Sequence, residues 1–322
     1  MDLSELGEFG FLARVARWVP PGTAPVGIGD DAAVLDVSEG SSVVATADAL
    51  VEGVHFRWDW SKPADVGYKS VTANVSDLAA MGARPRWLLL TLCAPRSTTE
   101  EILHDLYEGV QAACVDYGTE LVGGDTVSAD TFVVSVAALG DVAGDPLRRS
   151  GAKVGDVLAV TGPLGRAAAG VNLLLSQDPK KVSPEDALAC MAAHTRPLAR
   201  VAEGLALRRS GVHAAIDISD GLGSDVRRLA EASGVGAEID LERLPVAAEA
   251  RRVADARGWD IERMVLGGGE DYELLVALPP DQLGSLEIEL IQVGRVVEDG
   301  VWLVREGRRE PLELEGWDHF KT

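Results

Sequence analysis

The 322-residue chain is long enough for two domains, and its 47% hydrophobic and 25% charged residues exclude a disordered protein. Its formal net charge of −21, from 51 acidic against 30 basic residues, argues against nucleic acid or an anionic membrane as a partner, because so acidic a surface repels both. A phosphate ligand is not excluded, since Mg²⁺ held by carboxylates reverses the charge locally.

The cysteines and the first residues indicate the compartment. Cys93, Cys114 and Cys190 lie far apart without a CxxC spacing, which is typical of reduced thiols in a cytoplasmic protein. The first ten residues lack the basic and apolar regions of a signal peptide. No apolar run reaches the roughly 20 residues that a membrane helix needs. We therefore expect a cytoplasmic protein.

The first part of the chain alternates helical and extended patterns. Helices are predicted for residues 4–19, 65–81 and 98–117, and strands for residues 42–47, 87–93, 119–122 and 132–139. Ser4 and Asp65 are the expected N-caps of the first two helices. Gly82 and Gly118 are expected to end the second and third helices.

Residues 140–155 are rich in Gly, Asp and Arg and have no apolar face, so we place a domain boundary there. The first domain then covers residues 1–145 and the second covers residues 146–322. In the second, strands are predicted for 157–160, 213–218 and 272–278, helices for 164–176, 184–194, 197–209 and 222–233, and mostly extended structure for the last forty residues. Long helices between isolated strands predict an α/β (α+β) fold with two mixed domains.

Aspartates recur after apolar, β-prone runs that end in small residues. The four places are GIGDD (Asp30, Asp31), VVATAD (Asp48), ELVGGD (Asp125) and AAIDISD (Asp217, Asp220). Asp and Gly are poor strand residues, so each aspartate is expected where a strand ends and loops form a cleft. One such aspartate is usually a turn or N-cap residue. Four of them favour a shared site.

A further aspartate lies on the helix predicted for residues 65–81. Ser70, Asn74 and Asp77 follow one another at i, i+4 and i+7 and form a polar stripe on one helix face. The stripe is either the solvent face of the helix or the wall of a cleft. Apart from Lys69, the helix lacks the Lys and Glu residues that a solvated face carries, which favours the cleft.

So many carboxylates without His or Cys favour hard cations, Mg²⁺ before Zn²⁺. Several Mg²⁺ ions in one cleft are typical of a polyphosphate site. The sequence contains neither a G-x-S-x-G elbow nor a P-loop or dinucleotide-binding motif. ATP would therefore need another phosphate-binding loop. Candidates are the Gly123–Gly124 turn, the ISDGLGSD junction and the GGGED segment.

Seven motifs occur in order between about residues 5 and 320: GIGDDAAVLD, ATADALVEGVHF, NVSDLAAMGARP, LVGGDTV, AIDISDGLGSD, GGGEDYELL and GWDHF. This series resembles that of the thiamine-monophosphate kinase family, which belongs to the ATP-binding proteins related to aminoimidazole ribonucleotide synthetase. The resemblance implies a transferase that moves the γ-phosphoryl group of ATP directly onto thiamine monophosphate and yields thiamine diphosphate. It also implies several Mg²⁺ ions per site and a homodimer. The N-terminal domain would bind ATP and Mg²⁺ and pair in the dimer, and the C-terminal domain would complete the active-site cleft.

The resemblance also carries residue roles onto matching positions of this chain. Metal-binding positions fall on Asp30, Thr46, Ala47, Asp48, Asp77, Asp125, Asp217 and Asp220. Nucleotide-binding positions fall on Tyr107, Gly124, Asp125, Arg149 and Ser219, and positions lining the thiamine site fall on His55, Glu270 and Trp317. Asp48, Asp125 and Asp220 are the expected catalytic residues. The family often has Thr or Ser where this chain has Ala47, which could bind a metal only through its carbonyl. We expect Asp31 to be a turn residue, or a residue that supports a ligand, rather than a direct ligand.

Two other functions compete with this interpretation. Other enzymes of the superfamily use a reactive cysteine, either in an N-terminal Gly-rich segment or at the C-terminus. The chain has no Cys up to Leu92 and ends in HFKT. A non-enzymatic sensor of nucleotide and Mg²⁺ would keep the aspartates but could lose the acceptor-site residues. His55, Glu270 and Trp317 are all present, which favours the enzyme.

Overall fold

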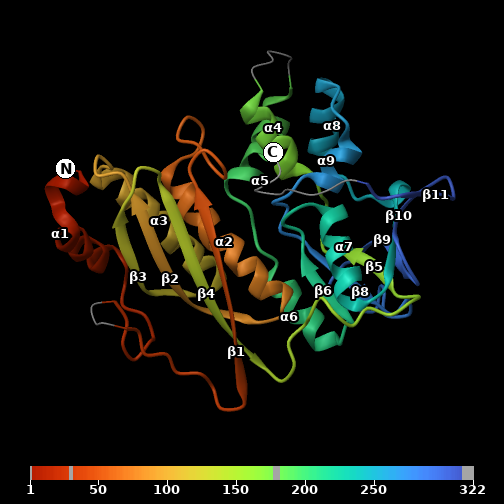
Figure 1. Cartoon of the computed structure of the whole chain (residues 1–322), viewed down its shortest axis with the longest axis horizontal. Coiled ribbons are helices and arrows are strands. Elements are labelled where there is room, and N and C mark those ends of the chain that lie inside the picture. The colour runs from red at the N-terminus through yellow and green to blue at the C-terminus, as the bar shows by residue number, and fades with distance from the viewer. Residues whose placement is uncertain (1, 29–31, 177–181, 314–322) are drawn as a thin grey trace. The chain divides into compact units, whose positions relative to one another are not determined.

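The computed structural model of the chain describes residues 2–28, 32–176 and 182–313. The chain divides into two units: Met1–Leu78 with Ala83–Asp145, and Ala79–Gly82 with Pro146–Thr322. Each unit combines helices with one mixed β-sheet (Figure 1). The expected α/β class is confirmed. Within the described residues, no helix combines the length and the apolar character that crossing a bilayer would need.

The sheet of the first unit has the strand order β1-β4-β2-β3. Its strands are β1 (Ser41–Val51), β2 (Arg84–Ala94), β3 (Glu120–Ser128) and β4 (Val133–Ala143). β4 is antiparallel to both β1 and β2, whereas β2 and β3 are parallel. Alternate residues are buried along β4, in the pattern of a sheet that has only one face covered.

The helices of the first unit are α1 (Leu3–Trp18), α2 (Pro63–Ala80) and α3 (Glu100–Tyr117). Gly118 ends α3 in the left-handed conformation, as predicted. Two cap predictions were wrong. Asp2 rather than Ser4 caps α1, because its carboxylate accepts the backbone N–H of Glu5. Asp65 lies inside the first turn of α2, because the helix already begins at Pro63, where proline fits well.

Two glycines let α2 and α3 approach each other closely. A Cβ atom on Gly67 would lie 2.0 Å from the carbonyl oxygen of Leu106, and one on Gly109 would lie 1.8 Å from that of Ala64. Both distances are far below a van der Waals contact. Each helix therefore contacts the backbone of the other at a position where no side chain fits.

The sheet of the second unit has the strand order β11-β10-β7-β9-β5-β8-β6. Its strands are β5 (Val157–Val160), β6 (Ala214–Asp217), β7 (Gly236–Asp240), β8 (Leu274–Leu278), β9 (Ile291–Val297), β10 (Val301–Arg305) and β11 (Arg308–Pro311). β10 and β7 are parallel, and the other neighbouring pairs are antiparallel. Strands β5 and β8 and the edge strand β6 are buried along their whole length.

The helices of the second unit are α4 (Arg166–Leu175), α5 (Pro184–Thr195), α6 (Val201–Ser210), α7 (Leu222–Ser233), α8 (Ala248–Arg257) and α9 (Ile261–Gly267), with a 3₁₀ turn at Leu241–Arg243. One face of α7 packs into the core through Leu222, Val226 and Leu229, which are inaccessible to solvent. The junction between β6 and α7 is thereby held in place, and this junction carries the ISDGLGSD motif.

Candidate active site

Three predicted metal-binding residues follow one another on β1, the first strand in the sheet order. Thr46 and Asp48 pair with the buried residues Ala138 and Val136 of β4, whereas Ala47 pairs with the half-buried Ala137. Because side chains alternate along a strand, Thr46 and Asp48 share the covered face of the sheet and Ala47 lies on the other face. Only the backbone of Ala47 can then take part in a site on the covered face.

Thr46 and Asp77 meet between β1 and α2. The hydroxyl of Thr46 donates a hydrogen bond to Oδ2 of Asp77 at 2.6 Å. The structure thus brings together two residues that lie 31 positions apart in the sequence. An oxygen pair of this kind suits a hard cation.

The polar stripe on α2 is not a solvent face. Ser70 and Asn74 are almost inaccessible, and their side chains donate hydrogen bonds to the carbonyls of Gly67 (2.8 Å) and Ser70 (2.9 Å). The solvent-face alternative is therefore wrong for these two residues. The side-chain oxygen of Asn74 is buried and accepts no hydrogen bond from the described residues.

Asp125 lies on β3 and faces away from Asp48. It pairs with Thr91 of β2, which alternates with the buried residues Leu90 and Leu92. Asp48 shares the face of Leu90 through the register of β4. The first unit by itself therefore puts Asp48 and Asp125 on opposite faces of the sheet.

Gly124, beside Asp125, has a φ of +156°, and a Cβ atom there would lie 1.8 Å from the carbonyl oxygen of Leu90. Only glycine fits this position. The backbone of Leu90 on β2 therefore fills the space that a side chain at position 124 would need.

Tyr107 is buried in an aromatic cluster. Its ring lies 6.1 Å from that of Phe11 and 6.0 Å from that of Trp18. Burial raises the pKa of the Tyr107 hydroxyl well above its usual range, so the phenol stays protonated. Its contact with a nucleotide stays a prediction.

His55 follows β1 in a turn and is half-buried. Its Nδ1 accepts a hydrogen bond from the backbone N–H of Val51 at 3.0 Å. In the neutral ring the proton is then on Nε2. This hydrogen bond fixes the orientation of the imidazole relative to the end of β1.

In the second unit, the ISD segment after β6 and the GGGED segment lie side by side. The backbone N–H of Glu270 donates to the carbonyl of Ser219 (2.8 Å), and that of Tyr272 donates to the carbonyl of Ile218 (2.9 Å). A Cβ atom on Gly269 would lie 2.1 Å from the Ser219 carbonyl oxygen. The GGGED segment therefore runs directly along the ISD segment and brings Glu270 next to Ser219.

The backbone of the GGGED segment is strained. Glu270 has a φ of +67° and Tyr272 a φ of +50°, which side-chain-bearing residues rarely adopt. Nδ1 of the buried His194 lies 2.7 Å from a carboxylate oxygen of Glu270. His194 thus contacts a predicted substrate-binding residue, although no motif in the sequence indicated it.

At the end of β6, Asp217 is buried and Asp220 is half-buried. Arg228 of α7 contacts the carboxylates of both Asp220 and Asp225. Asp225 also accepts the backbone N–H of Asp220 at 3.1 Å. Burial and the neighbouring Asp220 raise the pKa of Asp225 to about 7, against the opposing effect of Arg228.

The sequence reasoning did not single out Asp225 and Arg228. The available signal was their i, i+3 spacing on a helix that begins directly after a candidate metal-binding aspartate. Arg149 lies in an exposed loop, and its carbonyl accepts a hydrogen bond from Ser233 at 3.0 Å. The predicted residues Asp30, Asp31 and Trp317 lie outside the described residues.

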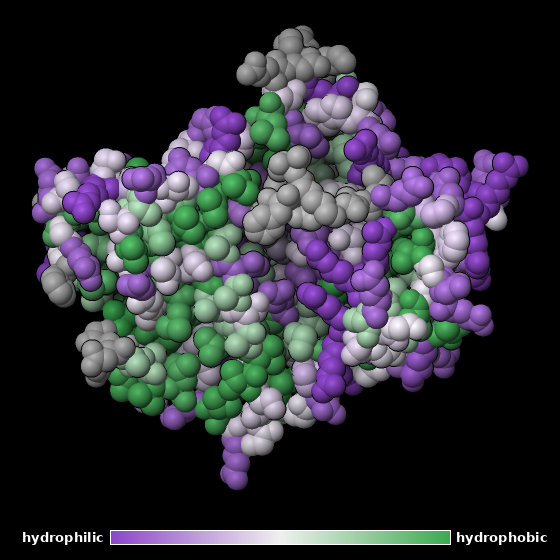
Figure 2. Space-filling model, in the orientation of Figure 1, coloured by the Kyte–Doolittle hydropathy of each residue, from purple (hydrophilic) through white to green (hydrophobic). Residues whose placement is uncertain are grey.

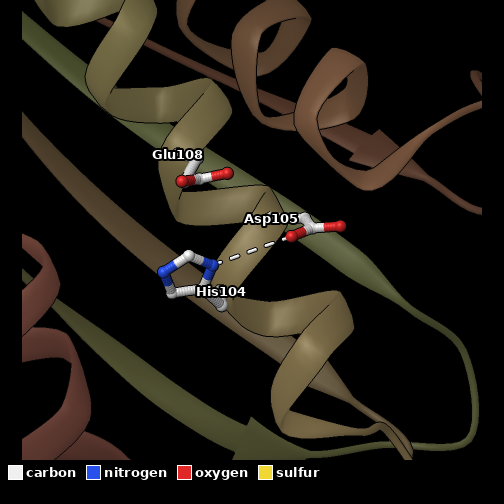
Figure 3. Close-up of side chains that lie close together, drawn as sticks. All are labelled: His104, Asp105 and Glu108. Atoms are coloured by element: carbon white, nitrogen blue, oxygen red, sulfur yellow. Dashed lines mark ion pairs between the residues drawn. The ribbon is translucent and has the colours of Figure 1, made fainter.

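A group of possible metal ligands also occurs away from these motifs. His104, Asp105 and Glu108 project from α3, with Nδ1 of His104 3.7 Å from Oδ1 of Asp105 (Figure 3). All three come from one helix and are partly or fully exposed. The group shows no further feature that points to an ion.

Asp271, the last residue of the GGGED segment, should make stability depend on pH. Its carboxylate accepts the backbone N–H of Gly165 at 2.8 Å at the start of α4, yet burial raises its pKa to about 7. The folded chain then binds this proton more tightly than the unfolded chain, so the stability contributed by the group is full below about pH 4 and is lost as the pH rises towards 7.

We expect Asp271→Asn to remove this dependence. Urea denaturation at several pH values between 4 and 8 should show a free-energy difference between wild type and variant that changes by up to about 1.4 kcal/mol per pH unit below pH 7. Parallel pH profiles for the two proteins would contradict the assignment to Asp271.

The two units match the two domains of a single superfamily. Residues 29–142 match the N-terminal domain of AIR synthase related proteins, and residues 153–302 match the C-terminal domain. The chain is thus an AIR synthase related protein, with both domains in the usual order.

Relatives narrow the class to one family. The chain is 39% identical to thiamine-monophosphate kinase of Mycobacterium tuberculosis over 99% of this chain and 93% of that protein. It is equally similar to the enzyme of Salmonella typhimurium, over 98% of this chain and 99% of that protein. A solved structure of AaThiL complexed with AMPPCP and TMP has a TM-score of 0.81 at 35% identity and covers 99% of both chains. The chain belongs to the thiamine-monophosphate kinase family and is an enzyme.

Proposed function

We propose that this enzyme transfers the γ-phosphoryl group of ATP in line onto the phosphate of thiamine monophosphate and yields thiamine diphosphate, in a Mg²⁺-dependent reaction. Relatives at 39% identity carry the name of this activity, and a similar structure holds AMPPCP and TMP. The observation in this chain that carries the proposal is the pair of oxygen donors that Thr46 and Asp77 form between β1 and α2.

The donors present fit Mg²⁺. Thr46, Asp48, Asp77, Asp217 and Asp220 offer only oxygen atoms, which this hard cation prefers. At Asp220 the guanidinium of Arg228 already takes the position of a cation. When bound, Mg²⁺ would neutralise the phosphate charges.

The residues of the chain need not supply a general base. A phosphate monoester oxygen is already an anion near pH 7, so the acceptor attacks without losing a proton to the enzyme. The obstacle is electrostatic, because two unit charges at 4 Å repel by about 4 kcal/mol at an effective dielectric constant near 20. The acidic residues serve to collect the cations that lower this repulsion. The two loops that pair through Ser219 and Glu270 would hold the reactants in line.

The remaining roles follow the family pattern. We assign Tyr107, Gly124, Arg149 and Ser219 to the nucleotide and His55, Glu270 and Trp317 to the thiamine moiety. His194 would orient Glu270 through their 2.7 Å contact.

We further propose a cytoplasmic homodimer that pairs through the first unit. One face of its sheet carries the exposed side chains of Val43, Leu89 and Val127, with exposed fractions of 48%, 38% and 46%. Figure 2 shows hydrophobic residues gathered over this part of the molecule. A second copy of the chain offers the same apolar face, which suits a symmetric interface.

Direct assay of the product tests the proposal. The purified chain is incubated with ATP, Mg²⁺ and thiamine monophosphate, and thiamine diphosphate is measured by chromatography. In one control EDTA removes the metal, and in the other thiamine replaces thiamine monophosphate as the acceptor. We expect the diphosphate only when metal and thiamine monophosphate are both present. Nucleotide binding without any transfer would support the sensor function instead.

His55→Ala tests the assignment of the acceptor site. We expect the KM for thiamine monophosphate to rise about tenfold or more while the KM for ATP changes less than about twofold, because only acceptor contacts are lost. Steady-state kinetics with each substrate varied in turn measures both values. His104→Ala, on α3, serves as the control and should change neither. A rise in the KM for ATP alone would place His55 in the nucleotide site.

A further inference from the structure

Arg228 is bound to a predicted metal ligand. On α7 it contacts Oδ2 of Asp220 and, at 3.1 Å, Oδ1 of Asp225. The Asp225 side chain is 1% exposed, whereas those of Asp220 and Arg228 are 24% and 41% exposed. The guanidinium therefore lies between a buried carboxylate and one that solvent reaches.

The two contacts are not equivalent. Asp225 belongs to the same helix, three residues before Arg228, so this pair moves with α7. Asp220 lies before the helix begins, at the end of the loop that follows β6. Both contacts are made by Nη1 of Arg228, so this one group must move for Asp220 to be released, while Asp225 stays beside it on the helix.

The charge around Arg228 favours the binding of a further cation beside its guanidinium. Two carboxylates face one guanidinium, so the group carries a net charge of about −1 when all three are ionised. A divalent cation at Asp220 would meet the guanidinium at close range, and the two positive charges would repel each other. Arg228 and a metal ion therefore compete for the same carboxylate.

We propose that Arg228 occupies Asp220 in the metal-free enzyme and is displaced from it when a divalent cation binds. The inference rests on the proposed function of Asp220 as a metal ligand. Arg228 is then a positioning residue that weakens metal binding by the free enzyme. A nucleotide polyphosphate favours the displacement, because its negative charge attracts both the metal and the released guanidinium. The metal consequently binds best together with ATP.

Metal titration of the full chain tests this competition. Mn²⁺ binding without nucleotide is followed by electron paramagnetic resonance for wild type, Arg228→Gln and Arg228→Lys. We expect Arg228→Gln to bind Mn²⁺ about tenfold more tightly than wild type and Arg228→Lys to stay within about twofold. The advantage of Arg228→Gln should shrink when a non-hydrolysable ATP analogue is added.

A matched control lies one residue away. Arg227 is on the same helix but donates its Nη2 to the carbonyl of Leu312 at 2.6 Å. Arg227→Gln removes the same charge and should leave the Mn²⁺ affinity near the wild-type value. An equal gain in both variants would show a general charge effect and overturn the proposal.

Folding is controlled separately, because Arg228→Gln leaves the buried Asp225 without its arginine. The double variant Arg228→Gln/Asp225→Asn removes both charges and should also bind Mn²⁺ more tightly than wild type. Unchanged or weaker affinity in folded variants would overturn the inference, while normal thiamine diphosphate formation by wild type would leave the proposed function intact. If Arg228→Gln gains Mn²⁺ affinity but the wild type forms no thiamine diphosphate, the competition at Asp220 stands and the proposed function fails.

Discussion

Replacing Asp48 with asparagine is expected to lower kcat by on the order of 10³-fold at saturating Mg²⁺. The side chain lies with Thr46 on the covered face of the sheet, where Thr46 already meets Asp77. Asparagine has almost the same shape but lacks the charge that would hold a divalent cation against the phosphates. Steady-state kinetics at increasing Mg²⁺ measures the loss.

Asp141→Asn is the matched control for this experiment. Asp141 belongs to the same sheet, on β4, and its carboxylate pairs with Arg86 at 3.4 Å. The same chemical change there should leave kcat within about twofold. If Asp48→Asn kept near-normal turnover, Asp48 would have to be removed from the catalytic residues.

Gly109→Ala should destabilise the first unit by about 3 kcal/mol. The added methyl group would lie 1.8 Å from the carbonyl oxygen of Ala64, so α2 and α3 must move apart. The movement would also carry Asp77 away from Thr46, and activity should fall together with stability. Urea denaturation monitored by circular dichroism measures the change.

Gly10→Ala provides the comparison within the same unit. Gly10 lies in α1, where the nearest atom to an added methyl group is Cβ of Leu6 at 3.8 Å, an ordinary contact. Here alanine should leave stability unchanged or raise it by up to about 1 kcal/mol, since it favours the helix. Equal stability losses at both positions would contradict the role given to the helix crossing.

The sequence correctly predicted the helices and strands whose ends are determined by residues close to them in the chain. The helix over Leu222–Ser233 begins and ends where expected, because its apolar residues keep a regular spacing and Gly234 ends it in the left-handed conformation. Strand β5 was likewise predicted at Val157–Val160. Other elements were missed. α8 exposes charged residues such as Arg251 and has a weak apolar stripe, while β7 has the sequence GAEID, in which Gly, Glu and Asp are poor strand residues.

The candidate site was predictable as a list of residues but not as an arrangement. The prediction that each aspartate lies where a strand ends is confirmed for Asp217 but wrong for Asp48 and Asp125, because β1 and β3 continue to Val51 and Ser128. That Thr46 meets Asp77, and that Glu270 lies beside Ser219, depends on contacts between distant segments, which periodicity does not contain. The opposite facing of Asp48 and Asp125 follows from sheet order and register. Sheet order and register cannot be predicted from the spacing of the two aspartates in the sequence.

The backbone hydrogen bonds between the ISD and GGGED segments have a thermodynamic consequence. They join the chain next to Asp220 to the chain at Glu270 and Tyr272, so a displacement of one segment shifts the other. If Asp220 holds the cation and Glu270 the thiamine, as we propose, the two ligands are linked. Each then alters the affinity of the enzyme for the other by the same factor, and the size of this reciprocal effect can be obtained by titrating either one in the presence of the other.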